Sequence, residues 1–205
     1  MIDKISKKIL VLLSNDKKTE EEKEILLFGI TRIVEDIPKT IGIILIGLLL
    51  GIIKEMLVVT IVMALYKSFA GGVHAKSNIG CFIYSLAFYL IIIYMSKYLV
   101  FTGINKYGVY TLMYIFAIYV TYVYIPADVP EIPKVNVKLR KEMKLKAIIS
   151  LNLMYVITIL VIQDVLVQNL IIYTIFLINV MTTRTIYKLF KAEYGFETYI
   201  PDELI

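Results

Sequence analysis

Residues 147–183 read AIISLNLMYVITILVIQDVLVQNLIIYTIFLINVMTT, and Asp164 is the one charged residue in this stretch. On either side of Asp164 the run is long enough to cross the ~30 Å hydrocarbon core of a membrane as a helix. Residues 77–96 and 107–127 are two further runs without Asp, Glu, Lys or Arg. None of these runs alternates strictly between apolar and polar residues, as the strands of a membrane β-barrel do. The sequence therefore predicts membrane-spanning helices.

The composition of the whole chain indicates the same class. Hydrophobic residues make up 59% of its 205 residues and charged residues 19%, whereas a soluble domain is roughly 45–50% apolar. A soluble fold of this size would leave much of that apolar surface in water, which excludes an ordinary soluble enzyme. The net charge of +5 lies at the ends of the apolar segments, a placement that favours membrane topology over nucleic-acid binding.

We predict an all-α fold, a polytopic membrane helix bundle that forms a single domain over residues 1–205. Two shorter apolar runs between residues 40 and 66 flank the charged pair Lys54-Glu55, which predicts a helical hairpin with this pair at its tip. Six transmembrane helices are predicted in total, at about residues 37–53, 56–70, 81–98, 108–126, 146–163 and 167–185.

Amphipathic helices are predicted before the bundle. Ile2, Ile5 and Ile9 recur at helical spacing with lysines on the opposite face, a pattern suited to an anionic membrane surface. Thr19, followed three residues later by Glu22, indicates a capping box that begins a second helix. The domain therefore divides into three parts: amphipathic cytoplasmic-face helices over residues 1–36, the transmembrane bundle over 37–186 and a cytoplasmic tail over 187–205.

The positively charged residues predict the orientation of the bundle, because Lys and Arg collect on the cytoplasmic side. With both termini in the cytoplasm, 19 of the 22 Lys and Arg residues lie on the cytoplasmic side. Only Lys54, Lys97 and Lys106 lie outside, and the opposite orientation would reverse this distribution. We therefore predict a multi-pass protein of the cell membrane, with the segment 67–81 facing the cytoplasm.

That segment reads KSFAGGVHAKSNIGC and contains the chain's single histidine, His74, and its single cysteine, Cys81. An imidazole is the usual base that generates a thiolate nucleophile. On an unbroken helix the two would stand about 10.5 Å apart, but the glycines and Asn78 allow the chain to fold back. Cys81 would then open a helix, whose N-terminus favours the thiolate. The alternative is a cysteine that packs in a helix and a solvated histidine, and two ligands do not close a metal site.

The pattern Gly-Gly-x-His-Ala-x-Ser, with a cysteine four residues later, resembles the signature of the accessory gene regulator protein B family. These are bacterial membrane cysteine endopeptidases that process a quorum-sensing propeptide. The stretch Pro126-Ala127-Asp128, with its trailing prolines and the basic run 138–141, resembles the loop after the fourth span of that family. The length and the pattern of spans are similar too, so the resemblance covers nearly the whole chain.

The resemblance implies that Cys81 is the nucleophile and His74 the catalytic histidine. Lys67 stands where the family commonly has Arg, and Gly71, Gly72 and Ser77 match other positions of the motif. The implied substrate is a precursor with an amphipathic leader, a signal sequence and an acidic C-terminal tail. Removal of the tail gives a cyclic thiolactone, or a lactone in some members. The implied chemistry needs no cofactor and no metal.

Each of the charged residues predicted on the cytoplasmic side near this segment has two possible roles. Asp128 could orient His74, or it could only shape the turn after Pro126. Lys138, Arg140 and Lys141 could attract the acidic tail, or they could only anchor the topology.

Asn152 and Asn179 lie inside predicted spans and are expected to bond between helices or across a homodimer, because an unpaired amide is costly in lipid.

Other functions remain open from the sequence. One is a protease of the same type that acts on a different peptide without cyclisation. A small membrane transporter or exporter of peptides is the second, although the predicted spans lack a chain of intramembrane carboxylates or arginines. A non-catalytic membrane scaffold that docks a peptide is the third. The expected partners are the precursor, the lipid bilayer and a second copy of the chain, and no nucleic acid is expected.

Overall fold

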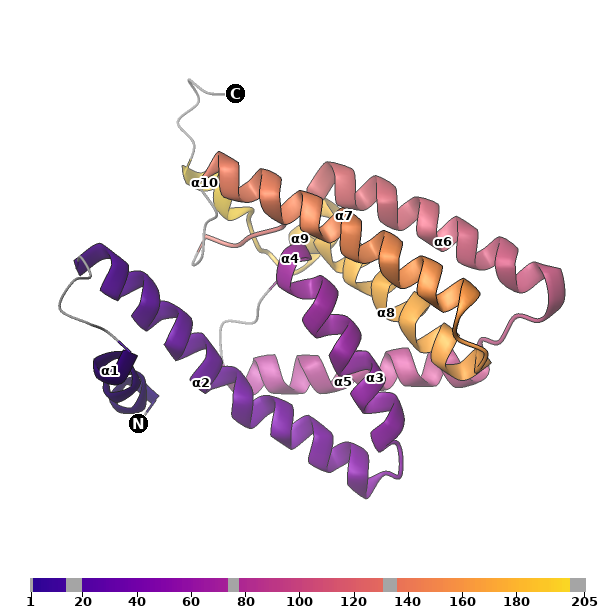
Figure 1. Cartoon of the computed structure of the whole chain (residues 1–205), viewed down its shortest axis with the longest axis horizontal. Coiled ribbons are helices and arrows are strands. Elements are labelled where there is room, and N and C mark those ends of the chain that lie inside the picture. The colour runs from indigo at the N-terminus through magenta and orange to yellow at the C-terminus, as the bar shows by residue number, and fades with distance from the viewer. Residues whose placement is uncertain (1, 14–19, 74–77, 131–135, 200–205) are drawn as a thin grey trace. The chain divides into compact units, whose positions relative to one another are not determined.

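A computed structural model describes residues 2–13, 20–73, 78–130 and 136–199 of the chain (Figure 1). The described residues are predominantly helical, which confirms the all-α prediction. The chain divides into two compact units, residues 1–53 and 54–205. All the candidate site residues predicted from the sequence belong to the second unit.

The first unit consists of α1 (Ile2–Leu13), which packs on α2 (Glu20–Leu49). The sequence predicts a helix at about residues 20–34 and a separate span from about 37, but α2 runs through this boundary without a break. Pro38 lies inside the helix, where it removes one backbone donor. The ion pair between Lys39 Nζ and Asp36 Oδ1, at 3.2 Å, adds a contact along the same turn. Thr19, the predicted cap, lies outside the described residues.

The turn that ends α2 differs from the predicted one. Gly51 has a φ of +68°, a left-handed conformation that glycine adopts without strain. The amide of Ile52 donates to the carbonyl of Gly47 at 2.8 Å and closes the helix end. The predicted tip, Lys54-Glu55, instead lies in the first turn of α3 (Ile53–Val62), where Glu55 Oε1 pairs with Lys97 Nζ at 2.7 Å.

The second unit continues from α3 through a π-helical turn, η1 (Met63–Lys67), into the short α4 (Ser68–Ala70). Four helices then follow: α5 (Asn78–Tyr98), α6 (Gly103–Tyr124), α7 (Val137–Leu160) and α8 (Val165–Thr182). These four are the described helices that are long and apolar enough to cross a membrane, whereas the sequence predicted six spans. The first two predicted spans fall in α2 and in the α3–α4 stretch.

α8 is the central helix of this unit. In its most apolar window 61% of the residues are buried, against 22–28% for the other three spans, and it packs against α5, α6 and α7 (Figure 1). Asp164 separates α7 from α8 as predicted, and its carboxylate caps α8 by accepting from the amide of Leu166 at 2.9 Å. The polar residues of the spans pair between helices as predicted: Asn152 Oδ1 accepts from Tyr114 at 2.6 Å.

α7 begins at Val137, well before the predicted start at residue 146. Asn136 explains the early start, because its side chain accepts from the amide of Leu139 at 3.1 Å and caps the helix. The basic residues of the predicted loop therefore lie on the first turns of a helix.

The predicted cytoplasmic tail is folded as far as the structure describes it. Two short helices follow α8, namely α9 (Arg184–Leu189) and α10 (Gly195–Tyr199). The rings of Tyr187 and Tyr194 stack at 4.1 Å and are buried with Ala127 and Val129 in one apolar cluster. Residues 184–197 are thus a part of the folded second unit.

Candidate active site

Cys81 lies in the first turn of α5, the position that the sequence predicted. Its thiol is free and partly exposed. His74 and Ser77 lie outside the described residues. Val73 and Asn78 are the described residues on either side of them.

The glycine pair that precedes His74 is bound to the Pro-Ala-Asp segment. Gly71 forms a parallel β-bridge with Ala127. The amide of Gly72 donates to the carbonyl of Ala127 at 3.0 Å, and the amide of Ala127 donates to the carbonyl of Ala70 at 2.8 Å. The two sequence segments that carry the family resemblance, far apart in the chain, are therefore joined directly by backbone hydrogen bonds.

The backbone conformation at both positions, and the close approach at one of them, explain why both are glycines. Gly71 has a φ of +77°, and a Cβ there would lie 1.9 Å from the carbonyl oxygen of Ala127, well inside any real contact. Gly72 has a φ of +131°, which side chains rarely adopt, but a Cβ there would meet Thr182 only at 3.9 Å. Gly71 is thus required by both space and conformation, and Gly72 by conformation alone.

Asp128 forms a buried ion pair. Its Oδ2 accepts from Arg140 Nη1 at 3.1 Å, with the carboxylate side chain fully buried. A second guanidinium nitrogen donates to the carbonyl of Pro126 at 3.2 Å, and the guanidinium lies over the ring of Phe196 at 4.1 Å. Arg140, expected to be available for substrate, therefore fastens the Pro126–Asp128 loop to α7, while Lys138 and Lys141 are exposed.

Two buried tyrosines, which the sequence analysis did not select, pack against the same loop through Ala127 and Val129. Tyr187 donates its hydroxyl proton to the carbonyl of Asp128 at 3.1 Å. Tyr194 donates to the carbonyl of Thr182 at the end of α8. Burial raises the pKa of both phenols above the ordinary value of tyrosine, and the neighbouring Asp128 carboxylate adds to the rise. Both hydroxyls are therefore protonated donors at physiological pH.

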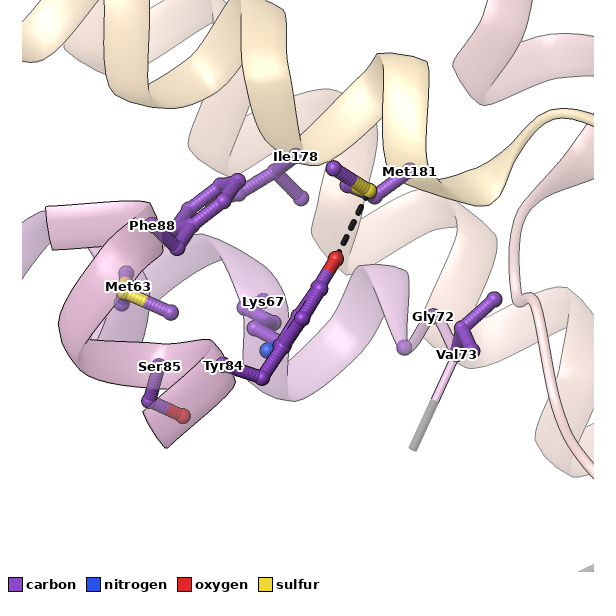
Figure 2. A pocket seen from close by; sticks show the side chains of 10 residues that line it. Met63, Lys67, Gly72, Val73, Tyr84, Ser85, Phe88, Ile178 and Met181 are labelled. Carbon is purple, nitrogen blue, oxygen red and sulfur yellow. Dashed lines mark hydrogen bonds between the residues drawn. The ribbon is translucent and has the colours of Figure 1, made fainter. Parts of the chain in front are cut away.

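A pocket lies between the Gly71–Val73 segment and α5 (Figure 2). Tyr84, Ser85 and Phe88 line it from α5. They follow Cys81 by three, four and seven residues, so all share one helix face with the thiol. The remaining walls come from η1, the glycine segment and α8, through Met63, Lys67, Gly71, Gly72, Val73, Ile178 and Met181. Lys67, predicted as a supporting residue, thus belongs to this pocket.

A buried hydrogen-bond network fixes the helix turn that carries Lys67. The hydroxyl of Tyr66 lies 2.8 Å from that of Thr121 and donates to Asn179 Oδ1 at 3.1 Å. The network joins η1, α6 and α8, and confirms the expectation that Asn179 bonds between helices. The presence of Asn179 inside an apolar span indicated a hydrogen bond between helices, but the sequence could not identify its partners.

Within the described ranges, no three His, Cys, Asp or Glu side chains come together as a metal site requires. The described polar groups that line the pocket are the Lys67 amine, the hydroxyls of Tyr84 and Ser85 and backbone amides, and the Cys81 thiol lies one turn before Tyr84 on α5. This set of groups suits nucleophilic chemistry at a carbonyl carbon.

The family model described as Accessory gene regulator B matches residues 1–186. A "Putative AgrB-like protein" of Clostridium acetobutylicum is 30% identical, with 98% of this chain and 96% of that protein covered. Two proteins of Clostridium perfringens, also named as AgrB-like, are 26% and 24% identical over 70% of this chain and 69% of each of theirs. No solved structure matches the chain at a significant level. The chain therefore belongs to the accessory gene regulator B family, the family of the agr quorum-sensing system.

Proposed function

We propose that the chain is a membrane cysteine endopeptidase that removes the C-terminal tail of a quorum-sensing propeptide. The observation that carries the proposal is the position of Cys81. It lies at the start of α5, on the helix face that lines a pocket to which Val73, the residue before His74, also contributes. The two chain segments that would bear the base and the nucleophile thus border one pocket.

In the first step, the imidazole of His74 takes the thiol proton and the Cys81 thiolate attacks the carbonyl carbon of the last signal residue. The peptide bond breaks, the imidazolium gives its proton to the leaving amine, and the tail departs with a new N-terminus. The signal segment remains on Cys81 as an acyl-thioester. Backbone amides at the start of α5 are candidates to stabilise the oxyanion, since helix N-termini stabilise developing negative charge.

In the second step, a thiol within the signal segment attacks the acyl-thioester. A new thioester replaces the old one, so the exchange is nearly balanced in energy and needs no ATP. The Cys81 thiol is regenerated and a cyclic thiolactone leaves. Water competes with the internal thiol, so the acyl-enzyme has to be shielded. The apolar residues around the pocket, including Phe88 and Ile178, support such shielding.

Substrate capture would use the membrane surface and charge. In the orientation that the sequence predicts, a precursor leader and the amphipathic α1 lie in the same cytoplasmic interface, which raises the local concentration of substrate. Lys138 and Lys141 are exposed on α7 and would attract the acidic tail, each cation contributing about 1 kcal/mol near the surface. Arg140 would act indirectly, because it is paired with Asp128.

Cleavage in liposomes tests the proposal. Purified chain is mixed with its precursor, and release of the tail is followed by mass spectrometry. Cys81→Ala and His74→Ala are each expected to abolish release while inserting normally. Ser96→Ala, at the opposite end of α5, is the matched control and should cleave like the unmodified chain. Tail release by Cys81→Ala would refute the cysteine mechanism and favour a scaffold for a separate protease.

A further inference from the structure

The chain after α8 contacts both halves of the candidate site. Residues 187–194, which we call the C-terminal clamp, run from within α9 to the residue before α10. They lie beyond residue 186, where the match to the family model ends, so that match gives them no role. Their contacts in the fold are therefore the basis for assigning one.

One side of the clamp contacts the helix that carries Cys81. The ring of Phe190 meets the ring of Tyr84 edge to face, with the centroids 5.6 Å apart and the planes at 86°, a geometry that aromatic pairs favour. Tyr84 follows Cys81 by about one helical turn. Its hydroxyl donates to Met181 Sδ on α8 at 2.9 Å (Figure 2). Tyr84 thus ties the start of α5 both to α8 and to the clamp.

The other side of the clamp supports the segment that leads to His74. The described part of that segment ends at Val73, which packs against the buried cluster of Tyr187 and Tyr194. The two tyrosine rings stack with their centroids 4.1 Å apart, and each hydroxyl donates to a backbone carbonyl. Val73 therefore rests on a cluster whose own members are fixed by stacking and by hydrogen bonds.

A tight turn separates the two contacts of the clamp. Lys191 has a φ of +50°, a left-handed conformation that is uncommon for a residue with a side chain. Its amide donates to the carbonyl of Lys188 at 3.1 Å, and the amide of Ala192 donates to the carbonyl of Tyr187 at 2.9 Å. These are the two bonds of a Schellman motif, which ends α9. The turn lets Phe190 contact α5 while Ala192 packs against the tyrosine cluster.

We propose that residues 187–194 are a positioning element of the peptidase, with Phe190 and Tyr194 as its main positioning residues. The inference rests on the proposed function and adds residues that act through Tyr84 and Val73 rather than on the substrate itself. Phe190 fixes the helix that carries the nucleophile, and Tyr194 supports the segment that leads to the base. Such positioning matters because a displacement of about 1 Å can cost roughly a hundredfold in rate.

Cross-linking tests the clamp without any substrate. In a Cys81→Ser background, Val73→Cys and Ser85→Cys place two thiols on residues that line the same small pocket, one before the base and one on α5. The full chain is oxidised in liposomes, and disulfide formation is followed by mass spectrometry of its peptides. Phe190→Ala is expected to slow the reaction roughly tenfold, because the two segments are then no longer held together.

Two variants at the same helix end control this measurement. Leu189→Ala truncates the neighbouring side chain, which is 73% exposed, and should cross-link like the unmodified clamp. Phe190→Tyr keeps the aromatic ring and should restore the rate that Phe190→Ala loses. Phe190 is itself 45% exposed, so its truncation removes little buried surface and the variant should still insert.

Cleavage of the precursor in liposomes gives the second measurement. Phe190→Ala and Tyr194→Ala, each with Cys81 intact, should lower kcat roughly 10–100-fold and leave KM nearly unchanged, since neither residue is proposed to bind substrate. Tyr194→Phe, which loses only the hydroxyl, is the second variant if Tyr194→Ala does not insert, and its kcat should lie between the two. Tyr173→Ala is the matched control, because Tyr173 is also buried and donates to a backbone carbonyl, that of Leu99. It should keep its kcat even where it lowers stability.

The two measurements separate the clamp from the cysteine mechanism. The proposal is overturned if Phe190→Ala keeps the kcat of Leu189→Ala, if the two cross-link at equal rates, or if Tyr173→Ala lowers kcat as much as Tyr194→Ala does. Slower cross-linking in Phe190→Ala together with tail release by Cys81→Ala would support the clamp and refute the cysteine mechanism.

Discussion

Replacing Gly71 with alanine is expected to disrupt the junction between the two motif segments. A Cβ at this position would lie 1.9 Å from the carbonyl oxygen of Ala127, and the φ of +77° is itself unfavourable for alanine. The backbone strain costs roughly 1–3 kcal/mol. Separation of the segments also breaks the two hydrogen bonds that Ala127 makes with Ala70 and Gly72, at about 0.5–1.5 kcal/mol each. The expected total is about 2–6 kcal/mol.

Three other glycines provide graded controls. Gly72→Ala adds strain at φ +131° with no close contact, and Gly103→Ala adds strain at φ +59° in open space. Each should cost roughly 1–3 kcal/mol. Gly108 lies inside α6 with nothing near its Cβ position, so Gly108→Ala should be neutral or stabilising by up to about 1 kcal/mol.

The assay is denaturant unfolding in detergent micelles, with tail cleavage measured in parallel. Gly71→Ala should be the least stable of the four and should lose cleavage. Gly103→Ala, far from the pocket in the chain, should keep cleavage despite its strain. Equal destabilisation by Gly71→Ala and Gly103→Ala would refute the reasoning, because the contact with Ala127 would then contribute nothing.

Three further predictions concern the ion pair, the buried phenols and the orientation. Asp128→Leu or Arg140→Met alone should cost about 3–5 kcal/mol by removing one partner of this buried ion pair, and the double variant should recover most of that stability in the same unfolding assay. Because burial raises the pKa of Tyr194 in the folded state, the folded chain holds a proton that the unfolded chain releases near pH 10. Stability should therefore fall as the pH rises above about 10, and Tyr194→Phe should flatten this fall. In a Cys81→Ser background, Asn105→Cys should react with an impermeant thiol reagent in whole cells and Lys138→Cys should not, and the reverse labelling would overturn the predicted orientation.

The features that could be predicted from the sequence are local ones. Apolar runs without charges predicted α5 to α8, because a membrane helix satisfies its own backbone and needs only length and composition. Asp164 was predicted to divide α7 from α8, and it caps α8. The cluster of glycines and Asn78 before Cys81 predicted a helix start near the thiol, and α5 begins at Asn78.

The features that escaped prediction depend on contacts between distant residues. Nothing local in Tyr187 or Tyr194 distinguishes a buried donor from a tyrosine at the membrane interface, since both have an apolar ring and a polar tip. The pairing of Gly71 with Ala127 needs a β-bridge between segments more than 50 residues apart, and the glycines alone indicate only that the backbone has an unusual conformation. Proline favours the first turn of a helix, yet Pro38 is accommodated inside α2.

Arg140 shows that the sequence predicts the candidate site only in part. In the sequence it is one of several cations after the Pro-Ala-Asp segment, equivalent to Lys138 and Lys141. In the fold it is the partner of a buried carboxylate, a role that the planar guanidinium suits because it can also reach the Pro126 carbonyl. Sequence reasoning therefore selected this loop as a candidate, but it could not divide the three cations into one residue that pairs with Asp128 and two exposed ones.

Trapping the acyl-enzyme tests the central claim, that Cys81 is the nucleophile, most directly. A precursor whose internal cysteine is replaced by alanine cannot cyclise, so the acyl-thioester can be lost only to water. After incubation in liposomes and rapid acid quenching, mass spectrometry is expected to find the leader and signal segment bound to Cys81 and released by hydroxylamine, with one tail freed for each adduct formed. Release of the tail without any adduct on Cys81, or an adduct on another residue, would contradict the account.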